Sequence, residues 1–298
     1  MSPPIRAYLF APGGNERLLR KVFTVGADAV VLDLEDSVRE GQKTEARKLV
    51  AEALRARESD EIPIYVRINP VGGELWQEDV KAVAAPCLRG VRAPKAESSQ
   101  QLLALDQALS AIETRAGLPV GAIRIVPTIE TAAGVLAAGE MARAPRVEAM
   151  CFGMADFVRD IGGEVDESGS TTLYAQSHLV LVSRATGLIP PIAPVYMHLD
   201  DLDGLRLSSE TARRLGFFGR SCIHPKQVSV IQEVFTPSSE AVANAKAIIA
   251  GFEGTDANFE GAFVLKDGQF VDEAIVKRAR AVVDLSESLE HNTKGKCL

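Results

Sequence analysis

The feature that most constrains the fold of this chain is an alternation between short apolar or β-branched runs and longer segments of helical periodicity. Repeated strand–helix units of this kind are typical of a parallel sheet covered by helices. The expected strands are Ala7 to Phe10, Ala29 to Asp33, Ile64 to Ile68, Gly90 to Ala93, Arg124 to Ile129, Ala149 to Gly153, Leu188 to Val195 and Arg220 to Ile223. Eight such units predict a TIM (β/α)8 barrel over residues 1–235.

The seventh expected strand is the weakest of the set. Pro190, Pro191 and Pro194 cannot donate hydrogen bonds to a neighbouring strand. The prolines therefore argue against a complete strand here, and we still count this segment as the seventh of the eight expected strands.

Residues 236–298 follow the barrel and are expected to form a helical extension that acts as a lid. Thr236 and Pro237 match an N-cap followed by proline at the first helical position. A turn at Lys266, Asp267 and Gly268 then leads into an expected final helix from Asp272 to Glu290.

Charge and cysteine usage exclude several classes of partner. The net charge of −7 offers no basic surface for nucleic acid. The four cysteines show no spacing typical of zinc ligands, and Cys151 and Cys222 lie in apolar runs, as core thiols do. No uninterrupted apolar stretch is long enough to span a membrane, and the N-terminus does not look like a signal peptide. These observations favour a cytoplasmic enzyme.

Acidic residues stand where two neighbouring strands end. Glu130 follows the run that ends at Ile129, and Asp156 follows the run that ends at Gly153. Catalytic groups of parallel barrels lie at the carboxyl ends of the strands, and two carboxylates there can share one hard cation. Because the expected ligands are oxygens only, we favour Mg²⁺, with Mn²⁺ as an alternative.

Further polar residues fall at the same expected edge. The guanidinium group of Arg67 can bind a substrate carboxylate through two parallel hydrogen bonds. Lys95 is a second candidate for substrate binding. Asp33, Glu35 and Asp36 are expected to support the site. The alternatives to a functional role are purely structural: an ion pair of Arg67 with Asp33 or Glu35, and helix capping by the acidic residues. We expect His224 to be structural, and Trp76 to belong to the core.

Several short segments, taken in order, resemble the citrate lyase β-subunit family within the HpcH/HpaI aldolase superfamily. The matching segments are RAYLFAPG (6–13), DAVVLDLEDSV (28–38) followed by Lys43 and Arg47, VRINP (66–70), APK (93–95), PTIET (127–131), FGMADF (152–157), IHPKQ (223–227) and GAFVLKDGQFVDEAIVKRA (261–279). The chain departs from the family pattern at Ala193, where many members carry aspartate, and at Arg92, where the run before Pro94 and Lys95 is usually apolar.

The resemblance implies a Mg²⁺-dependent lyase that makes or breaks a carbon–carbon bond between a CoA thioester and a 2-oxo acid. Glu130 and Asp156 match the metal ligands of the family, and Arg67 matches the arginine that binds the oxo acid. Asp272 matches the acidic catalytic residue of the lid, which in several members enters an adjacent subunit, so a homo-oligomer, a trimer or hexamer, is expected. Met154 and Ala155 are expected to line the substrate site.

For the nucleotide part of CoA, Arg17 and Lys21 are the candidate phosphate contacts, with Arg92 a weaker one.

Three alternatives to a malyl-CoA or citramalyl-CoA lyase stay open. One is a citryl-thioester lyase subunit that acts on an acyl-carrier protein. The second is a catalytically silent acyl-CoA-binding protein. The third is a class II aldolase acting on free oxo acids, against which the long C-terminal extension argues.

Overall fold

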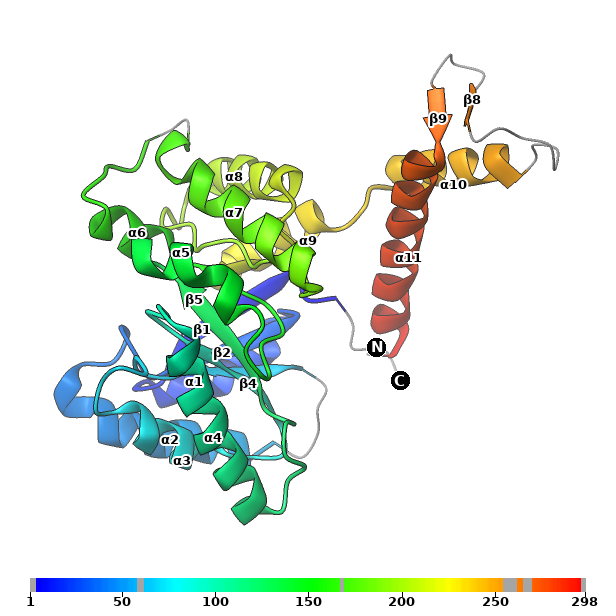
Figure 1. Cartoon of the computed structure of the whole chain (residues 1–298). Helices are drawn as coiled ribbons and strands as arrows, with labels where there is room; N and C mark the ends of the chain where they lie inside the picture. The colour runs from blue at the N-terminus through cyan, green and yellow to red at the C-terminus, as the bar shows by residue number, and fades with distance from the viewer. Residues whose placement is uncertain (1–3, 58–61, 167–168, 254–261, 265–269, 296–298) are drawn as a thin grey trace. The chain divides into compact units, whose positions relative to one another are not determined.

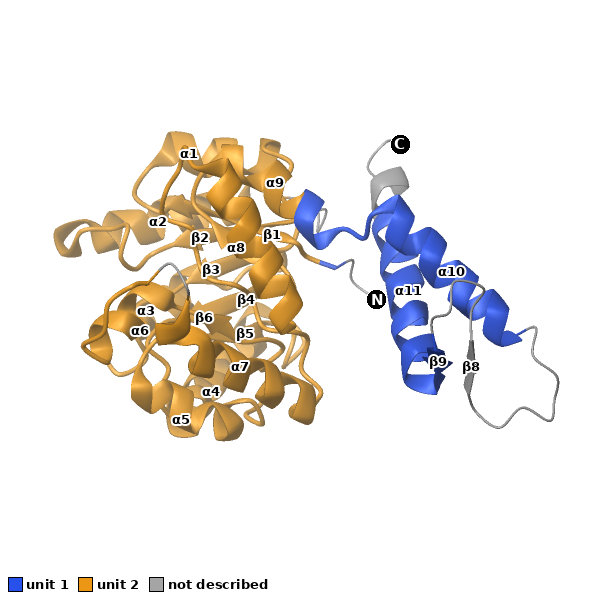
Figure 2. Ribbon diagram, turned by 90° about the horizontal axis from the view of Figure 1, so that it is seen from above, with its two compact units in different colours: residues 1–4, 233–298 blue, residues 5–232 orange. Residues whose placement is uncertain are grey.

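The chain forms two compact units in the computed structural model, which describes residues 4–57, 62–166, 169–253, 262–264 and 270–295. Residues 5–232 make up the larger unit, and residues 233–298 with 1–4 make up the smaller one (Figure 2). All the expected strand–helix units belong to the larger unit, and Asp272 belongs to the smaller one.

The larger unit is built on a curled, seven-stranded parallel sheet with the order β6-β5-β4-β3-β2-β1-β7. Its strands are β1 (Ala7–Pro12), β2 (Ala29–Asp33), β3 (Ile64–Arg67), β4 (Leu88–Ala93), β5 (Arg124–Ile129), β6 (Cys151–Phe152) and β7 (Arg220–Cys222). From β1 to β6, strands that follow one another along the chain are neighbours in the sheet, and β7 pairs with β1. The α/β class is thereby confirmed. The register pairs Asp33 with Arg67 and Arg67 with Arg92, and these pairings bring residues from distant parts of the sequence to one edge.

The expected seventh strand, Leu188 to Val195, does not form as predicted. Within it, Ile192 makes an isolated parallel bridge to Cys151, and Ala193 makes one to Arg220. The prolines on both sides lack the amide hydrogens that a longer ladder requires. The buried guanidinium of Arg220 partly replaces the ladder, because its Nη1 donates to the carbonyl oxygen of Pro194 at 2.9 Å.

Helices flank the curled sheet and connect its strands (Figure 1). The helices of the larger unit are α1 (Glu16–Lys21), α2 (Lys43–Arg55), α3 (Trp76–Val83), α4 (Ser99–Ala116), α5 (Ala132–Met141), α6 (Met154–Asp160), α7 (Ser170–Thr186), α8 (Leu202–Leu215) and α9 (Pro225–Phe235), with short 3-10 turns η1 (Val22–Thr24) and η2 (Glu40–Gln42). The last residues of α9, from 233 onward, already belong to the smaller unit. Local chemistry sets their ends. The hydroxyl of Ser98 caps α4 in a capping box with Gln101, and Gly117 ends the same helix with φ of 69°.

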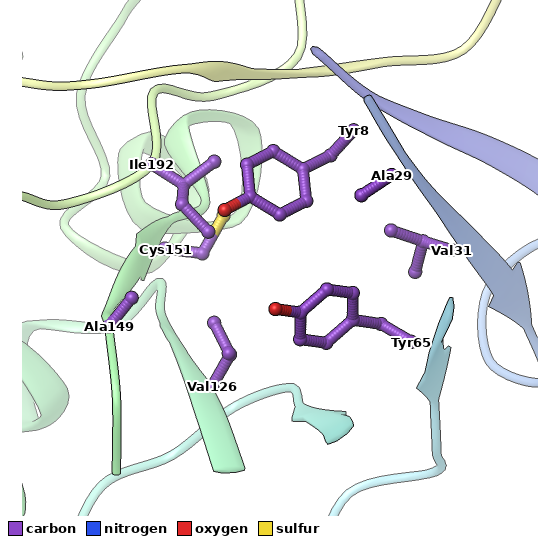
Figure 3. Packing of buried hydrophobic residues seen from close by; sticks show 8 residues of the cluster. All are labelled: Tyr8, Ala29, Val31, Tyr65, Val126, Ala149, Cys151 and Ile192. Carbon is purple, nitrogen blue, oxygen red and sulfur yellow. The ribbon is translucent and has the colours of Figure 1, made fainter. Parts of the chain in front are cut away.

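Side chains at alternating positions along the strands fill the space on the inner face of the curled sheet. Tyr8, Val31, Tyr65, Val126 and Cys151 belong to one buried cluster (Figure 3). The rings of Tyr8 and Tyr65 pack edge to face, with centroids 5.8 Å apart, a favourable geometry for aromatic pairs. Cys151 and Cys222 are buried free thiols and Trp76 is buried, as expected.

The smaller unit is a helical hairpin with an additional pair of strands. It contains α10 (Ser239–Glu253), α11 (Glu273–Gly295) and an antiparallel pair, β8 (Ala262–Val264) with β9 (Phe270–Asp272), which the sequence analysis did not predict. The expected N-cap at Thr236 is wrong, because α10 begins later and Ser238 Oγ accepts the amide hydrogen of Ala241. The expected turn at Lys266–Gly268 lies outside the described residues.

A search of the described helices for a membrane span found none of sufficient length and hydropathy.

Candidate functional site

Glu130 stands directly after β5, and two neighbours, Lys95 and Gly153, fix the position of its carboxylate. The backbone amide of Lys95 donates to Oε1 of Glu130 at 2.7 Å. Gly153, after β6, leaves room for the carboxylate, since a Cβ atom at position 153 would lie 2.3 Å from Oε2 of Glu130. Glu130 is 5% exposed. The strand ends therefore place a nearly buried carboxylate in one fixed position.

Asp156 lies in the first turn of α6, the helix that starts directly after Gly153. Its charge suits the positive end of a helix dipole, and its Oδ1 also accepts an ion pair from the exposed Arg159 at 2.5 Å. Met154 and Ala155 form the start of the same turn and connect Gly153 to Asp156.

The two acids and their surroundings suit a divalent cation. Burial, together with the charges of Asp156 and Glu35, raises the pKa of Glu130 to about 7 although the Lys95 amide opposes the rise. A buried carboxylate beside like charges is stabilised by a cation. Within the described ranges there is no group of three or more His, Cys, Asp or Glu side chains that could hold a metal ion. Mg²⁺ commonly uses one or two carboxylates and fills its other positions with water and substrate oxygens, so the residues present fit this ion.

Arg67 is held in a bidentate ion pair with Asp33. Nε and Nη2 of Arg67 lie 2.6 Å from the two carboxylate oxygens of Asp33, and Nη1 lies 2.9 Å from Oε2 of Glu35. Although burial alone would raise the pKa of Asp33, the hydrogen bonds and charge of Arg67 hold it below its ordinary value. The structural pairing that the sequence left open is therefore present, and any substrate must share Arg67 with two carboxylates of the chain.

Lys95 joins the same cluster through both its backbone and its side chain. Its Nζ lies 2.5 Å from Oε1 of Glu35 and 3.8 Å from Oδ1 of Asp36. Burial lowers the pKa of Lys95, but the hydrogen bond and charge of Glu35 outweigh this and raise it overall. The backbone of Lys95 has φ of 50°, a left-handed conformation that is uncommon for residues with a side chain. This conformation accompanies the amide bond to Glu130, and strained backbone of this kind is typical of functional sites.

A buried polar network, which the sequence analysis did not assemble, supports this edge of the sheet. Nζ of Lys43 donates to the carbonyl oxygens of Leu34 and Glu35, both at 2.8 Å, and to Oδ1 of Asn69 at 2.7 Å. Asp79 in turn accepts hydrogen bonds from Asn69. Lys43, and Asn69 within VRINP, were named from the sequence only as parts of the family resemblance, and a contact between them was not predicted.

Arg17 and Lys21, the candidate contacts for CoA phosphates, lie on α1 at a pocket of about 300 Å³. Apolar side chains from β1 and α1 supply much of its lining, and the loop after β7 adds Ile223, His224 and Pro225. Both basic residues are exposed. The third candidate, Arg92, is 1% exposed and lies in the interior of the sheet, so its expected contact with a phosphate at the surface is wrong.

Asp272 ends β9, and its Oδ1 accepts the amide hydrogen of Ile275 at 2.9 Å. Asp272 therefore caps α11. Since it belongs to the smaller unit, its role at the strand ends of the larger unit remains a prediction.

Comparison with protein families shows to which family the chain belongs. A family model described as HpcH/HpaI aldolase/citrate lyase matches residues 6–225. The chain belongs to this family. The predicted resemblance is thereby confirmed, and with it the expectation of an enzyme of the lyase class.

Relatives in the HpcH/HpaI family extend over almost the whole chain. The citrate lyase subunit beta of Haemophilus influenzae is 33% identical over 95% of this chain and 97% of its own. The L-malyl-CoA/beta-methylmalyl-CoA lyase of Cereibacter sphaeroides is 34% identical over 96% of both chains. Among solved structures, CitE from Mycobacterium tuberculosis in complex with magnesium, acetoacetate and coenzyme A superimposes with a TM-score of 0.79 at 27% identity, covering 96% of this chain and 100% of CitE.

Proposed function

We propose that this protein is a Mg²⁺-dependent carbon–carbon lyase. It would cleave, or form by condensation, a 3-hydroxyacyl-CoA thioester such as malyl-CoA or citramalyl-CoA, with acetyl-CoA and a 2-oxo acid as the other partners. The observation that carries the proposal is the pair Glu130 and Asp156 at the ends of adjacent strands, beside Lys95 and Arg67. The complex of CitE with magnesium, acetoacetate and coenzyme A supports it.

Glu130 and Asp156 would hold the cation. When bound, Mg²⁺ supplies Lewis acidity at the hydroxyl and carboxylate oxygens of the substrate. Arg67, oriented by Asp33, would add one hydrogen bond to the same carboxylate. Because Gly153 has no side chain, the carboxylate of Glu130 can occupy the position from which it would bind the cation.

The CoA part of the substrate would lie along the pocket between α1 and the loop after β7. Its apolar walls suit the pantetheine chain, and Arg17 and Lys21 suit the phosphates. Asp272 would donate a proton to the carbon released from the cleaved bond, or remove it in the condensation direction.

We further propose that the sheet closes into an eight-stranded barrel, in which the segment with Ile192 and Ala193 takes the place of one strand. Residues 1–235 would form this barrel, and residues 236–298 would form a lid. The bridges of these two residues to β6 and β7 support the closure. An assembled trimer or hexamer would allow the Asp272 of one subunit to act at the strand ends of its neighbour.

The first test is turnover of a panel of thioesters, measured by mass spectrometry in the presence of Mg²⁺. The panel contains malyl-CoA, citramalyl-CoA and citryl-CoA. Release of acetyl-CoA and an oxo acid, lost in Glu130→Ala and Asp272→Asn, would support the proposal. Absence of turnover with retained CoA binding would overturn it and leave the silent binding protein or an acyl-carrier substrate.

A mixing experiment tests the shared site. Glu130→Ala and Asp272→Asn proteins are each expected to be inactive, and co-folded mixtures are expected to regain part of the activity if Asp272 acts in a neighbouring subunit. Mixtures as inactive as the parents would show that each chain uses its own Asp272.

A further inference from the structure

Arg92 carries a positive charge into the interior of the curled sheet, and no carboxylate of the described residues forms an ion pair with it. It stands on β4 beside Arg67 in the register, and it is 1% exposed. Its Nη1 donates to Oγ of Ser221 at 2.8 Å and contacts Sγ of Cys151 at 3.5 Å. Its Nε and Nη2 have no hydrogen-bond partner among the described residues.

An unpaired guanidinium in such a position is costly. Buried charges in proteins are normally paired, and buried donors are normally bonded. The ring centroids of Tyr8 and Phe10 lie 4.7 and 5.4 Å from Cζ of Arg92, and their faces offer partial compensation. Figure 3 shows Tyr8 and Cys151, two of these neighbours, side by side in the cluster. Neither ring replaces an acceptor for Nε and Nη2.

Phe10 connects Arg92 with the candidate site. The same ring lies 5.2 Å from Cζ of Arg67, so the two guanidinium groups are neighbours across one side chain. Phe10 also lines the pocket at α1. Arg92 does not line this pocket, so a ligand there would reach it only after the half-buried ring of Phe10 had turned aside.

The other cations at the strand ends are already paired. Arg67 contacts Asp33 and Glu35, and Lys95 contacts Glu35. Carboxylates outnumber cations in this cluster, so a second carboxylate on a substrate would be repelled there. Arg92 is a neighbouring cation with two donors, Nε and Nη2, that have no partner within the described part of the chain.

We propose that Arg92 is a specificity-determining residue that receives the distal carboxylate of a dicarboxylic 2-oxo or 2-hydroxy acid once Phe10 has turned aside. The inference rests on the proposed function, because Glu130 and Asp156 must hold the cation that binds the other end of the acid. Within the proposed reaction class, this role favours a citryl thioester, whose oxo-acid half carries a second carboxylate, over malyl-CoA and citramalyl-CoA, whose oxo-acid halves carry one.

The test compares racemic malate and lactate, which share the 2-hydroxy acid group and differ by one distal carboxylate. Binding to the full chain is measured by isothermal titration calorimetry with Mg²⁺. We expect the wild-type protein to prefer malate, and Arg92→Met to weaken malate binding by about tenfold to a hundredfold while lactate binding stays unchanged, because charge-assisted hydrogen bonds are lost.

Arg220→Met is the matched control. Arg220 is also fully buried, but its Nη1 and Nη2 are bonded to Pro194 and Ser208. Its replacement is expected to lower the melting temperature and to leave the ratio of malate to lactate affinity unchanged. Arg92→Lys, which keeps the charge and loses the fork, is expected to retain part of the preference and serves if Arg92→Met does not fold.

The outcomes separate the two proposals. Equal effects of Arg92→Met on malate and lactate, or no preference in the wild-type protein, would overturn the role of Arg92 alone. Absence of binding of both acids in a wild-type protein that turns over the thioester panel would overturn this inference alone, whereas absence of Mg²⁺-dependent thioester turnover would overturn the proposed function together with it.

Discussion

The backbone amide of Lys95 donates a hydrogen bond of 2.7 Å to Oε1 of Glu130, and the Lys95 backbone takes a left-handed conformation in making it. The bond links the end of β4 to the end of β5 at the point where the candidate cation site lies. It fixes one carboxylate oxygen and leaves Oε2 of Glu130 turned toward Gly153. The geometry of the site is therefore set by backbone as much as by side chains.

Gly153→Ala is expected to abolish Mg²⁺ binding and activity. The added methyl group would lie 2.3 Å from Oε2 and 2.6 Å from Cβ of Glu130, so the carboxylate must move. Gly139→Ala is the control, because the nearest atom to its added Cβ is Nη1 of Arg143, at 3.9 Å. Alanine within a helix is expected to stabilise by about 0.5–1 kcal/mol. Titration calorimetry with Mg²⁺ checks both, and unchanged affinity in Gly153→Ala would contradict the assigned ligand.

The stability of the metal-free protein is expected to fall as pH rises from about 4.5 to about 7. Because the pKa of Glu130 is raised from 4.5 to about 7 in the folded state, the folded protein binds this proton more firmly than the unfolded chain does. The contribution is fully present at the acid end and is lost as pH rises through the folded pKa. Its upper limit is about 3 kcal/mol.

Urea unfolding across this pH range, with Glu130→Gln as the reference, isolates the contribution of Glu130 from those of its neighbours. The variant is expected to remove the corresponding slope, and Mg²⁺ is expected to stabilise the wild-type protein most at the alkaline end. Parallel pH profiles of wild type and variant would be inconsistent with the raised pKa.

Arg67→Met is expected to destabilise the fold by about 3 kcal/mol or more, because it leaves the buried carboxylate of Asp33 without its bidentate partner. Lys81→Met breaks an exposed pair with Glu78 and is expected to cost less than about 1 kcal/mol. Urea midpoints measure both changes. A loss in Arg67→Met no larger than in Lys81→Met would show that the pair contributes little.

Lys43→Met is expected to destabilise by about 1–3 kcal/mol, since it removes the donor shared by Leu34, Glu35 and Asn69. Thermal unfolding measures the loss, with the exposed Lys48→Met as the control. We also expect a raised KM. Lys43 holds the backbone carbonyl group of Glu35, and the carboxylate of Glu35 contacts both Arg67 and Lys95. A stable variant with unchanged KM would show that the network does not position the site.

The local pattern of the sequence was sufficient for much of the fold. The alternation of apolar runs and helical segments depends on neighbouring residues, and it located each strand of the parallel sheet. The same logic fails where the chemistry of one residue type intervenes, as in the proline-rich segment around Ile192, where only two bridges form. It also missed the pairing of β8 with β9 and the capping of α10 by Ser238.

The sequence by itself determined the strand–helix order, the placement of Glu130 and Asp156 after adjacent strands, and the family. Only the tertiary structure decided that Arg67 is paired with Asp33 and that Gly153 makes room for Glu130. It also decided that Arg92 is buried, with Nε and Nη2 lacking a partner among the described residues. The reason is physical: strand and helix periodicity is a property of neighbours in the chain, whereas these contacts join residues from different strands. Register and curvature of the sheet, which no single segment encodes, bring them together.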